Sequence, residues 1–241
     1  MQKQTSAQLK AAAKAQLMGN YPTVIGAICM MFLFSSLLTS ILNKALLLSL
    51  TGKSLTLSVM VIVLELGVLV LSGMMQAGLS YMMLKLTAGQ PIYTGDLFHC
   101  FIHNPGRIAK MSLYLGLILE ALNFPGMLLN AVFLNHVSPG TNLAYKLVSY
   151  GTAILTVYVA ILFSQIFYVA IDFPNYTPAD CFKASITLMK GNKGRLFYIM
   201  ISFLPLILLG LITFFVPYLW IVPYVEMTLA YFYLDIIRNR N

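Results

Sequence analysis

Six long runs of apolar residues constrain this chain more than any other feature of its sequence. A helix needs about 20 apolar residues to cross the roughly 30 Å hydrocarbon layer of a bilayer. Six stretches meet that length, at residues 22–42, 55–84, 108–134, 143–171, 196–215 and 217–236. Only 9% of the 241 residues are charged, whereas a soluble domain carries about 25%. The chain is therefore predicted to be an all-α polytopic membrane protein with six transmembrane helices.

The distribution of lysine and arginine predicts how these helices are oriented. With the N-terminus inside, the cytoplasmic segments carry 12 of the 15 basic residues, and the outer segments carry only Lys44, Lys53 and Lys146. Cytoplasmic loops of membrane proteins are enriched in basic residues. We therefore expect a multi-pass protein of the cell membrane with both termini in the cytoplasm. Because the basic residues are dispersed along the chain, no nucleic acid is expected as a partner.

A short phrase occurs twice in the chain, 172 residues apart. Residues 5–8 match residues 177–180, and each quartet begins with threonine and ends with a polar side chain. This is the spacing of a capping box, which starts a helix. Fourteen residues after each threonine the chain reads Gly-Asn, at 19–20 and 191–192, and both residues tolerate the left-handed conformation that ends helices. Each copy therefore predicts a short capped helix that is followed at once by a membrane span.

Both short helices are predicted to be amphipathic. Their apolar faces consist of Leu9, Ala13 and Leu17 in the first copy and of Phe182, Ile186 and Met189 in the second. Such helices are too short and too polar to span, so they should lie along the inner membrane surface. Basic side chains placed there can reach lipid phosphates. The residues expected to contact headgroups are Lys10, Lys14, Arg107, Lys183, Lys190, Lys193 and Arg195.

The repetition extends to a third, weaker copy at 93–107. Here Thr94 is predicted to cap a shorter helix, which ends at Asn104-Pro105-Gly106. The returning spans also repeat, because "QAGLSYMML" at 76–84 matches "EMTLAYFYL" at 226–234. The match pairs Gln76 with Glu226. Gln165 is the candidate for the corresponding polar residue in the returning span of the middle unit.

The repeats divide the chain into three pseudo-repeated hairpin units within a single integral membrane domain, residues 1–241. The units cover about 1–86, 93–172 and 177–238. Each unit is predicted to begin with a cytoplasmic interfacial amphipathic helix, and then to cross the membrane outward and back. Internal repetition is common in membrane folds and often places a site at the interface between repeats.

Three phrases of the chain resemble a known family. They are "AKAQLMGNYP" near the start, "ASITLMKGNKGRLFYI", and the closing "IVPYVEMTLAYFYLDI". They are similar to a family of bacterial integral membrane proteins catalogued as domain of unknown function nine hundred seventy-five, and the similarity runs over almost the whole chain. The resemblance implies a multi-pass protein of the cell membrane. It implies no established activity, so no functional residue is carried over from it.

Carboxylates inside the predicted spans are the main candidates for a site. Glu120 and Glu226 should lie near the middle of the bilayer and Glu65 nearer its outer face. A charge at the bilayer centre costs about 2.5–3.5 kcal/mol or more, so such residues face the bundle interior or a water-filled cavity. Two interpretations stay open. The carboxylates form a pathway for an ion or substrate, or they are protonated and hydrogen-bonded to neighbours such as Gln76 or Gln165.

The chain carries one weak candidate for a metal site and none of the usual catalytic motifs. His99 and His103 are four residues apart and could share a metal, but a lone pair is a weak signal and no second pair of ligands follows. The chain has no glycine-rich phosphate loop, no His-Glu-x-x-His and no Gly-x-Ser-x-Gly sequence. We therefore expect no metal, no cofactor and no enzymatic activity.

These observations favour a non-enzymatic membrane component. It would be an accessory factor, or a lipid- or peptide-binding factor, in export or envelope homeostasis. The alternative is a small transporter or channel that uses Glu120 and Glu226. The expected partners are membrane lipids, and another membrane protein or an ABC transporter remains open as a protein partner.

Overall fold

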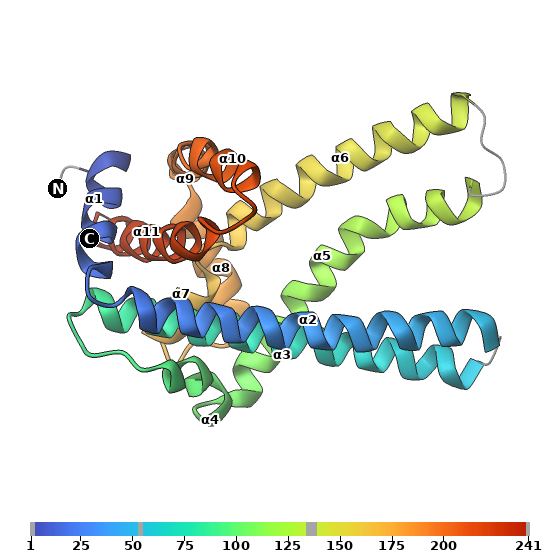
Figure 1. Cartoon of the computed structure of the whole chain (residues 1–241), viewed down its shortest axis with the longest axis horizontal. Helices are drawn as coiled ribbons and strands as arrows, with labels where there is room; N and C mark the ends of the chain where they lie inside the picture. Colours follow the sequence, from blue (N-terminus) through green and yellow to red (C-terminus); the bar gives the residue numbers. More distant parts are fainter. Residues whose placement is uncertain (1–2, 53–54, 134–138, 240–241) are drawn as a thin grey trace.

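The fold is known from a computed structural model that describes residues 3–52, 55–133 and 139–239 (Figure 1). This part of the chain is helical and contains no strand. The long helices are α2 (Tyr21–Gly52), α3 (Leu55–Thr87), α5 (Pro105–Phe133), α6 (Pro139–Phe163) and α11 (Tyr218–Arg238). The shorter ones are α1 (Ser6–Leu17), η1 (Thr94–Phe98), α4 (His99–Ile102), α7 (Ile166–Asp172), α8 (Pro178–Met189), α9 (Lys193–Ile201) and α10 (Leu204–Ile212).

Several of these helices are long and apolar enough to span a membrane, as expected for a membrane protein. Within the described residues there are five such segments, at Tyr21–Ala45, Val59–Thr87, Lys146–Asp172, Lys193–Ile212 and Tyr218–Arg238. They coincide with five of the six predicted spans. The sixth, 108–134, forms helix α5 but is not among the five, and its last residue lies outside the described ranges.

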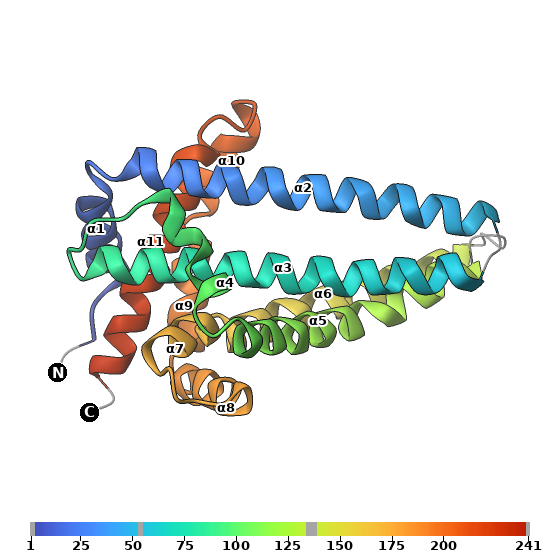
Figure 2. The same cartoon turned by 90° about the horizontal axis from the view of Figure 1, so that it is seen from below.

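The helices form three hairpins that do not all run in the same direction. Helices α2 and α3 pack along each other, and α5 packs against both α3 and α6. Figures 1 and 2 together show the third hairpin, from α9 through α10 to α11, crossing the first hairpin obliquely. Helix α11 contacts both α2 and α3 at this crossing. Both ends of the chain lie at the same end of the molecule (Figure 1).

The two short capped helices follow the predicted repeat closely. Both capping boxes form, since Thr5 pairs with Gln8 in the first and Thr177 pairs with Asp180 in the second. The fully buried side chains are Leu9, Ala13 and Leu17 in α1, and Cys181, Ser185 and Met189 in α8. Each of the latter stands 172 residues after its counterpart, so the two helices bury the same register positions.

The predicted apolar face of α8 was partly wrong. Met189 is buried, but Phe182 and Ile186 are only half-buried, and Cys181 and Ser185 occupy the inward line instead. The Ser185 hydroxyl is satisfied there because it donates to the Leu162 carbonyl at 2.8 Å. A small polar side chain that bonds to a neighbouring helix can therefore replace an apolar one at a buried position.

The Gly-Asn pairs end both helices as predicted. Gly19 and Gly191 have φ angles of 86° and 75°, which glycine adopts at little cost. In each copy the asparagine amide then donates to the carbonyl four residues back, from Asn20 to Gln16 at 3.2 Å and from Asn192 to Leu188 at 2.9 Å. These bonds satisfy carbonyls that the helix end leaves open.

The predicted cap of the middle copy was wrong by one residue. The helix there is a 3₁₀ turn, η1, whose N-cap is Tyr93 rather than Thr94. The carboxylate of Asp96 decides the register, because it accepts the Tyr93 backbone N–H at 2.9 Å and pairs with Lys85 at 2.9 Å. Asn104 has a φ of 54°, so the break predicted at Asn104-Pro105 is present.

Candidate functional site

Gln76 and Glu226, which the sequence comparison paired, are both half-buried and contact each other between α3 and α11. The Gln76 amide on α3 donates to Glu226 Oε1 on α11 at 3.3 Å. Around this pair, the Tyr168 hydroxyl from α7 donates to the Glu226 backbone carbonyl at 3.3 Å, and the Ser80 hydroxyl donates to the Gln76 carbonyl at 3.0 Å. Three helices therefore meet at one polar contact, as expected where repeats join.

The other candidate polar residues of the spans do not join this contact. Gln165 is fully buried at the break between α6 and α7, and its amide donates to the Ser164 hydroxyl at 3.0 Å. Its Oε1 atom accepts no hydrogen bond from the described residues. Glu65 and Glu120 are half-buried, and neither has a hydrogen-bond partner in the part of the chain that the structure describes. The structure thus groups Gln76 with Glu226 and leaves the two other carboxylates apart.

Two of the predicted headgroup residues instead direct their charge to helix ends within the protein. The Arg107 guanidinium donates to the carbonyls of Ala170, Phe173 and Tyr176, at 2.5 Å, 3.0 Å and 3.0 Å. These carbonyls belong to the C-terminal end of α7 and the turn after it. A cation at a helix C-terminus also complements the helix dipole. Arg107 therefore holds the start of α5 to the C-terminal end of α7.

Lys10 makes an equivalent contact from α1. Its ammonium donates to the Ser202 carbonyl at the end of α9 at 3.0 Å, and it lies 3.9 Å from the centre of the Phe203 ring. Burial lowers the pKa of Lys10. The ammonium caps the C-terminal end of α9 at the break between α9 and α10, so Lys10 links α1 to this helix pair.

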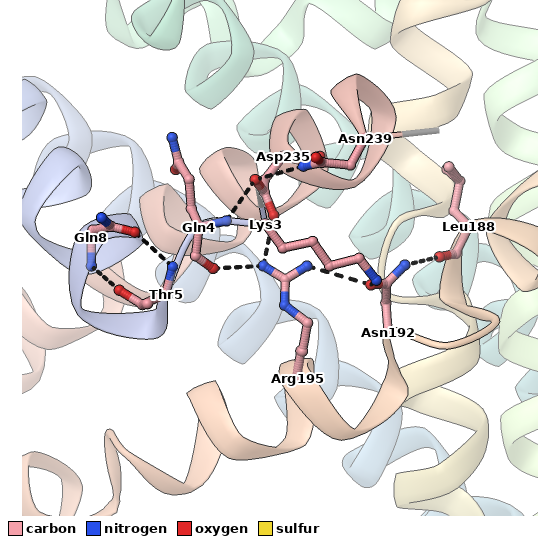
Figure 3. Close-up of polar contacts among 9 residues, drawn as sticks. All are labelled: Lys3, Gln4, Thr5, Gln8, Leu188, Asn192, Arg195, Asp235 and Asn239. Atoms are coloured by element: carbon pink, nitrogen blue, oxygen red, sulfur yellow. Dashed lines mark hydrogen bonds and ion pairs between the residues drawn. The ribbon is translucent and has the colours of Figure 1, made fainter. Parts of the chain in front are cut away.

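Arg195 is the centre of a polar cluster that ties the chain ends together (Figure 3). Its guanidinium pairs with Asp235 at 2.6 Å and donates to the Gln4 carbonyl at 2.8 Å. Asp235 also accepts the Gln4 backbone N–H at 3.2 Å and the Asn239 amide at 3.0 Å. Lys3 donates to Asn192 beside this pair, at 3.2 Å. The N-terminal segment is therefore fixed between α9 and α11.

Asp235 was not identified from the sequence as a site residue. Its side chain is only 4% exposed, and it lies in the last turn of α11, near the end of the predicted span 217–236. The sequence does contain a usable signal, since the whole chain has only 7 acidic residues. A carboxylate at the inner end of a span, in a chain with many basic residues near that surface, needs a cation as a partner.

Three of the lysines predicted to contact headgroups remain exposed without a side-chain partner in the described residues. Lys14 lies on α1, and Lys183 and Lys190 lie on and just after α8. The last member of the predicted set, Lys193, donates to the Tyr158 hydroxyl at 2.7 Å. Of the seven predicted headgroup residues, these three therefore keep an uncommitted charge, and all three belong to the two capped helices.

The two histidines form a stack of rings. The rings of His99 and His103 lie 4.1 Å apart and nearly parallel, and Tyr81 stacks on the other side of His99 at 3.8 Å. Parallel stacking does not bring the ring nitrogens together on one point, as a shared metal requires. No group of three or more His, Cys, Asp or Glu side chains in the described part of the chain could hold a metal ion.

Comparisons with known proteins identify the family of this chain but no activity. No curated protein and no solved structure matches the chain. One family does match, over residues 1–240, and its description is "Protein of unknown function (DUF975)". Because the match covers nearly the whole chain, the protein belongs to this family of unknown function.

Proposed function

We propose that this protein is a non-enzymatic component of the cell membrane whose capped helices α1 and α8 bind anionic lipid at the inner surface. The observation that carries the proposal is the set of exposed, uncommitted ammonium groups of Lys14, Lys183 and Lys190. Both helices bury an apolar line at matching positions and direct these lysines outward. In this arrangement both termini are cytoplasmic, and the lysines face the negatively charged leaflet.

The polar contact inside the bundle is assigned a structural role. The Gln76 amide engages the Glu226 carboxyl, and the neighbouring Met75, Leu79 and Met227 are fully buried. The Glu226 carboxyl therefore links α11 to α3 through a contact that is made within the protein, and no bound solute is needed to complete it. This supports a lipid-binding factor in export or envelope homeostasis over a transporter that uses Glu120 and Glu226.

Thermal unfolding in nanodiscs of defined lipid tests the proposal. A basic residue near an anionic membrane surface contributes about 1 kcal/mol of attraction. The wild-type protein should therefore melt several degrees higher in phosphatidylglycerol than in phosphatidylcholine. The triple variant Lys14→Ala, Lys183→Ala, Lys190→Ala should lose most of this difference.

The matched control for the triple variant changes lysines at the other end of the molecule. Lys44 and Lys146 are also exposed, so the double variant Lys44→Ala, Lys146→Ala lowers the net charge in a similar way. It should keep the wild-type difference between the two lipids. A control that loses as much of the difference as the triple variant, or a wild type that melts equally in both lipids, would contradict the proposal.

A further inference from the structure

An apolar groove lies between α5 and α8, beside the base of the second hairpin. Figure 2 shows α8 next to the start of α5, and the two helices are in contact. The groove has a volume of about 600 Å³ and is lined almost entirely by apolar atoms. The groove is shallow, since the lining residues Tyr114, Leu117 and Ile118 are themselves exposed.

One face of α5 supplies a continuous wall of the groove. The lining residues Tyr114, Leu117, Ile118 and Ala121 recur at intervals of three or four, so they form one stripe along the helix. Lys110 precedes Tyr114 by four residues and is exposed, so it stands on the same face at the inner end of the stripe. The wall is therefore apolar along its length and ends in a cation.

Helix α8 supplies the opposite wall and a second cation. Phe182 and Lys183 line the groove, and the Phe182 ring packs edge-on against Phe163 of α6 at 5.0 Å. The nearest carboxylate on α8, Asp180, is occupied because it accepts both the backbone N–H and the hydroxyl of Thr177. Lys183 has no side-chain partner among the described residues. Its ammonium thus lies at the groove without an ion pair, although Asp180 stands three residues before it on the same helix.

We infer that this groove binds one molecule of an anionic phospholipid. An acyl chain lies along the α5 stripe, and the phosphate contacts Lys183 and Lys110. The argument is charge complementarity: Lys183 at the groove, Lys110 one turn before its α5 wall, and the apolar lining match a molecule with an anionic head and a hydrocarbon tail. The inference rests on the proposed function, because it assigns one specific lipid site to the surface that the capped helices form.

Native mass spectrometry of the purified full-length chain in detergent, with added phosphatidylglycerol or phosphatidylcholine, tests this site. The wild-type protein should retain one phosphatidylglycerol molecule in preference to phosphatidylcholine. Lys183→Ala removes a charge-assisted bond to phosphate and should weaken retention about tenfold. Ala121→Trp fills the groove with a large side chain and should remove the bound lipid. The matched control Lys44→Ala removes an exposed charge on α2, outside the proposed lipid-binding lysines, and should retain the lipid as the wild type does.

The outcomes separate this inference from the proposed function. If the wild type prefers phosphatidylglycerol but Lys183→Ala and Ala121→Trp retain it equally well, the groove is not the site and only this inference fails. If the wild type shows no preference between the two lipids, the proposed function fails as well. Lys183 is exposed on a helix surface, so Lys183→Ala should fold, and a thermal melt in the same detergent verifies this for each variant.

Discussion

Replacing Asp235 with alanine is expected to lower the free energy of unfolding by about 3 kcal/mol, because it leaves a partly buried cation without its partner. The Arg195 side chain is 23% exposed, and its guanidinium lies 2.6 Å from the Asp235 carboxylate. The change also removes the acceptor for the Gln4 backbone N–H. Denaturant unfolding of the purified protein in detergent micelles would measure the loss.

Two further variants make this test specific to the ion pair. Asp180→Ala removes an exposed capping carboxylate and should cost clearly less than Asp235→Ala. The double variant Arg195→Met, Asp235→Leu removes both charges and should recover much of the stability, since a buried pair can be exchanged for apolar residues of similar size. Equal losses for Asp235→Ala and Asp180→Ala would show that Arg195 and Asp235 do not hold the N-terminal segment.

Gly78→Ala should destabilise the protein by about 3 kcal/mol, the upper end of the range for an overpacked site. A Cβ atom at Gly78 would overlap the backbone carbonyl of Leu97, which η1 places against α3. Backbone atoms cannot rotate away as a side chain can, so η1 would have to leave its position. Denaturant unfolding of the purified variant in detergent micelles would measure this loss of stability.

Gly67 on the same helix provides the matched control for this substitution. A Cβ atom there would meet no atom within 4 Å. Gly67→Ala should therefore be neutral or stabilising by roughly 0.5–1 kcal/mol, because alanine favours the helix. If Gly78→Ala and Gly67→Ala changed the free energy of unfolding equally, η1 would not lie this close to α3.

Local signals in the sequence predicted much of this fold. Both capping boxes and the left-handed Gly19 and Gly191 depend on interactions within a few residues. The buried positions of α1 and α8 are also 172 residues apart, although the apolar face predicted for α8 included Phe182 and Ile186 instead. The match between 76–84 and 226–234 also indicated two residues that turn out to touch, Gln76 and Glu226.

Features that depend on tertiary contacts were not predicted from the sequence. The cap at Tyr93 depends on Asp96, which is held by Lys85 on another helix. The inward position of Ser185 depends on a carbonyl of α6. Arg107 and Arg195 looked like headgroup residues, yet their guanidinium groups bond to α7 and to Asp235. The oblique crossing of the third hairpin has no local signature at all.

The position of α1 and α8 on the inner surface is the claim on which both lipid proposals depend. Labelling of single cysteines by a membrane-impermeant maleimide in intact and permeabilised cells tests it directly. Of the native thiols, Cys29 is replaced by serine. Cys100 and Cys181 are buried, and burial raises the pKa of both thiols, that of Cys100 to about 11. They should therefore react slowly.

The predicted pattern distinguishes the two ends of the molecule. The exposed positions Lys14→Cys and Lys183→Cys should be labelled only after permeabilisation, whereas Lys146→Cys should be labelled in intact cells. Labelling of Lys14→Cys or Lys183→Cys in intact cells, with Lys146→Cys protected, would place the capped helices on the outer surface and contradict the proposed topology.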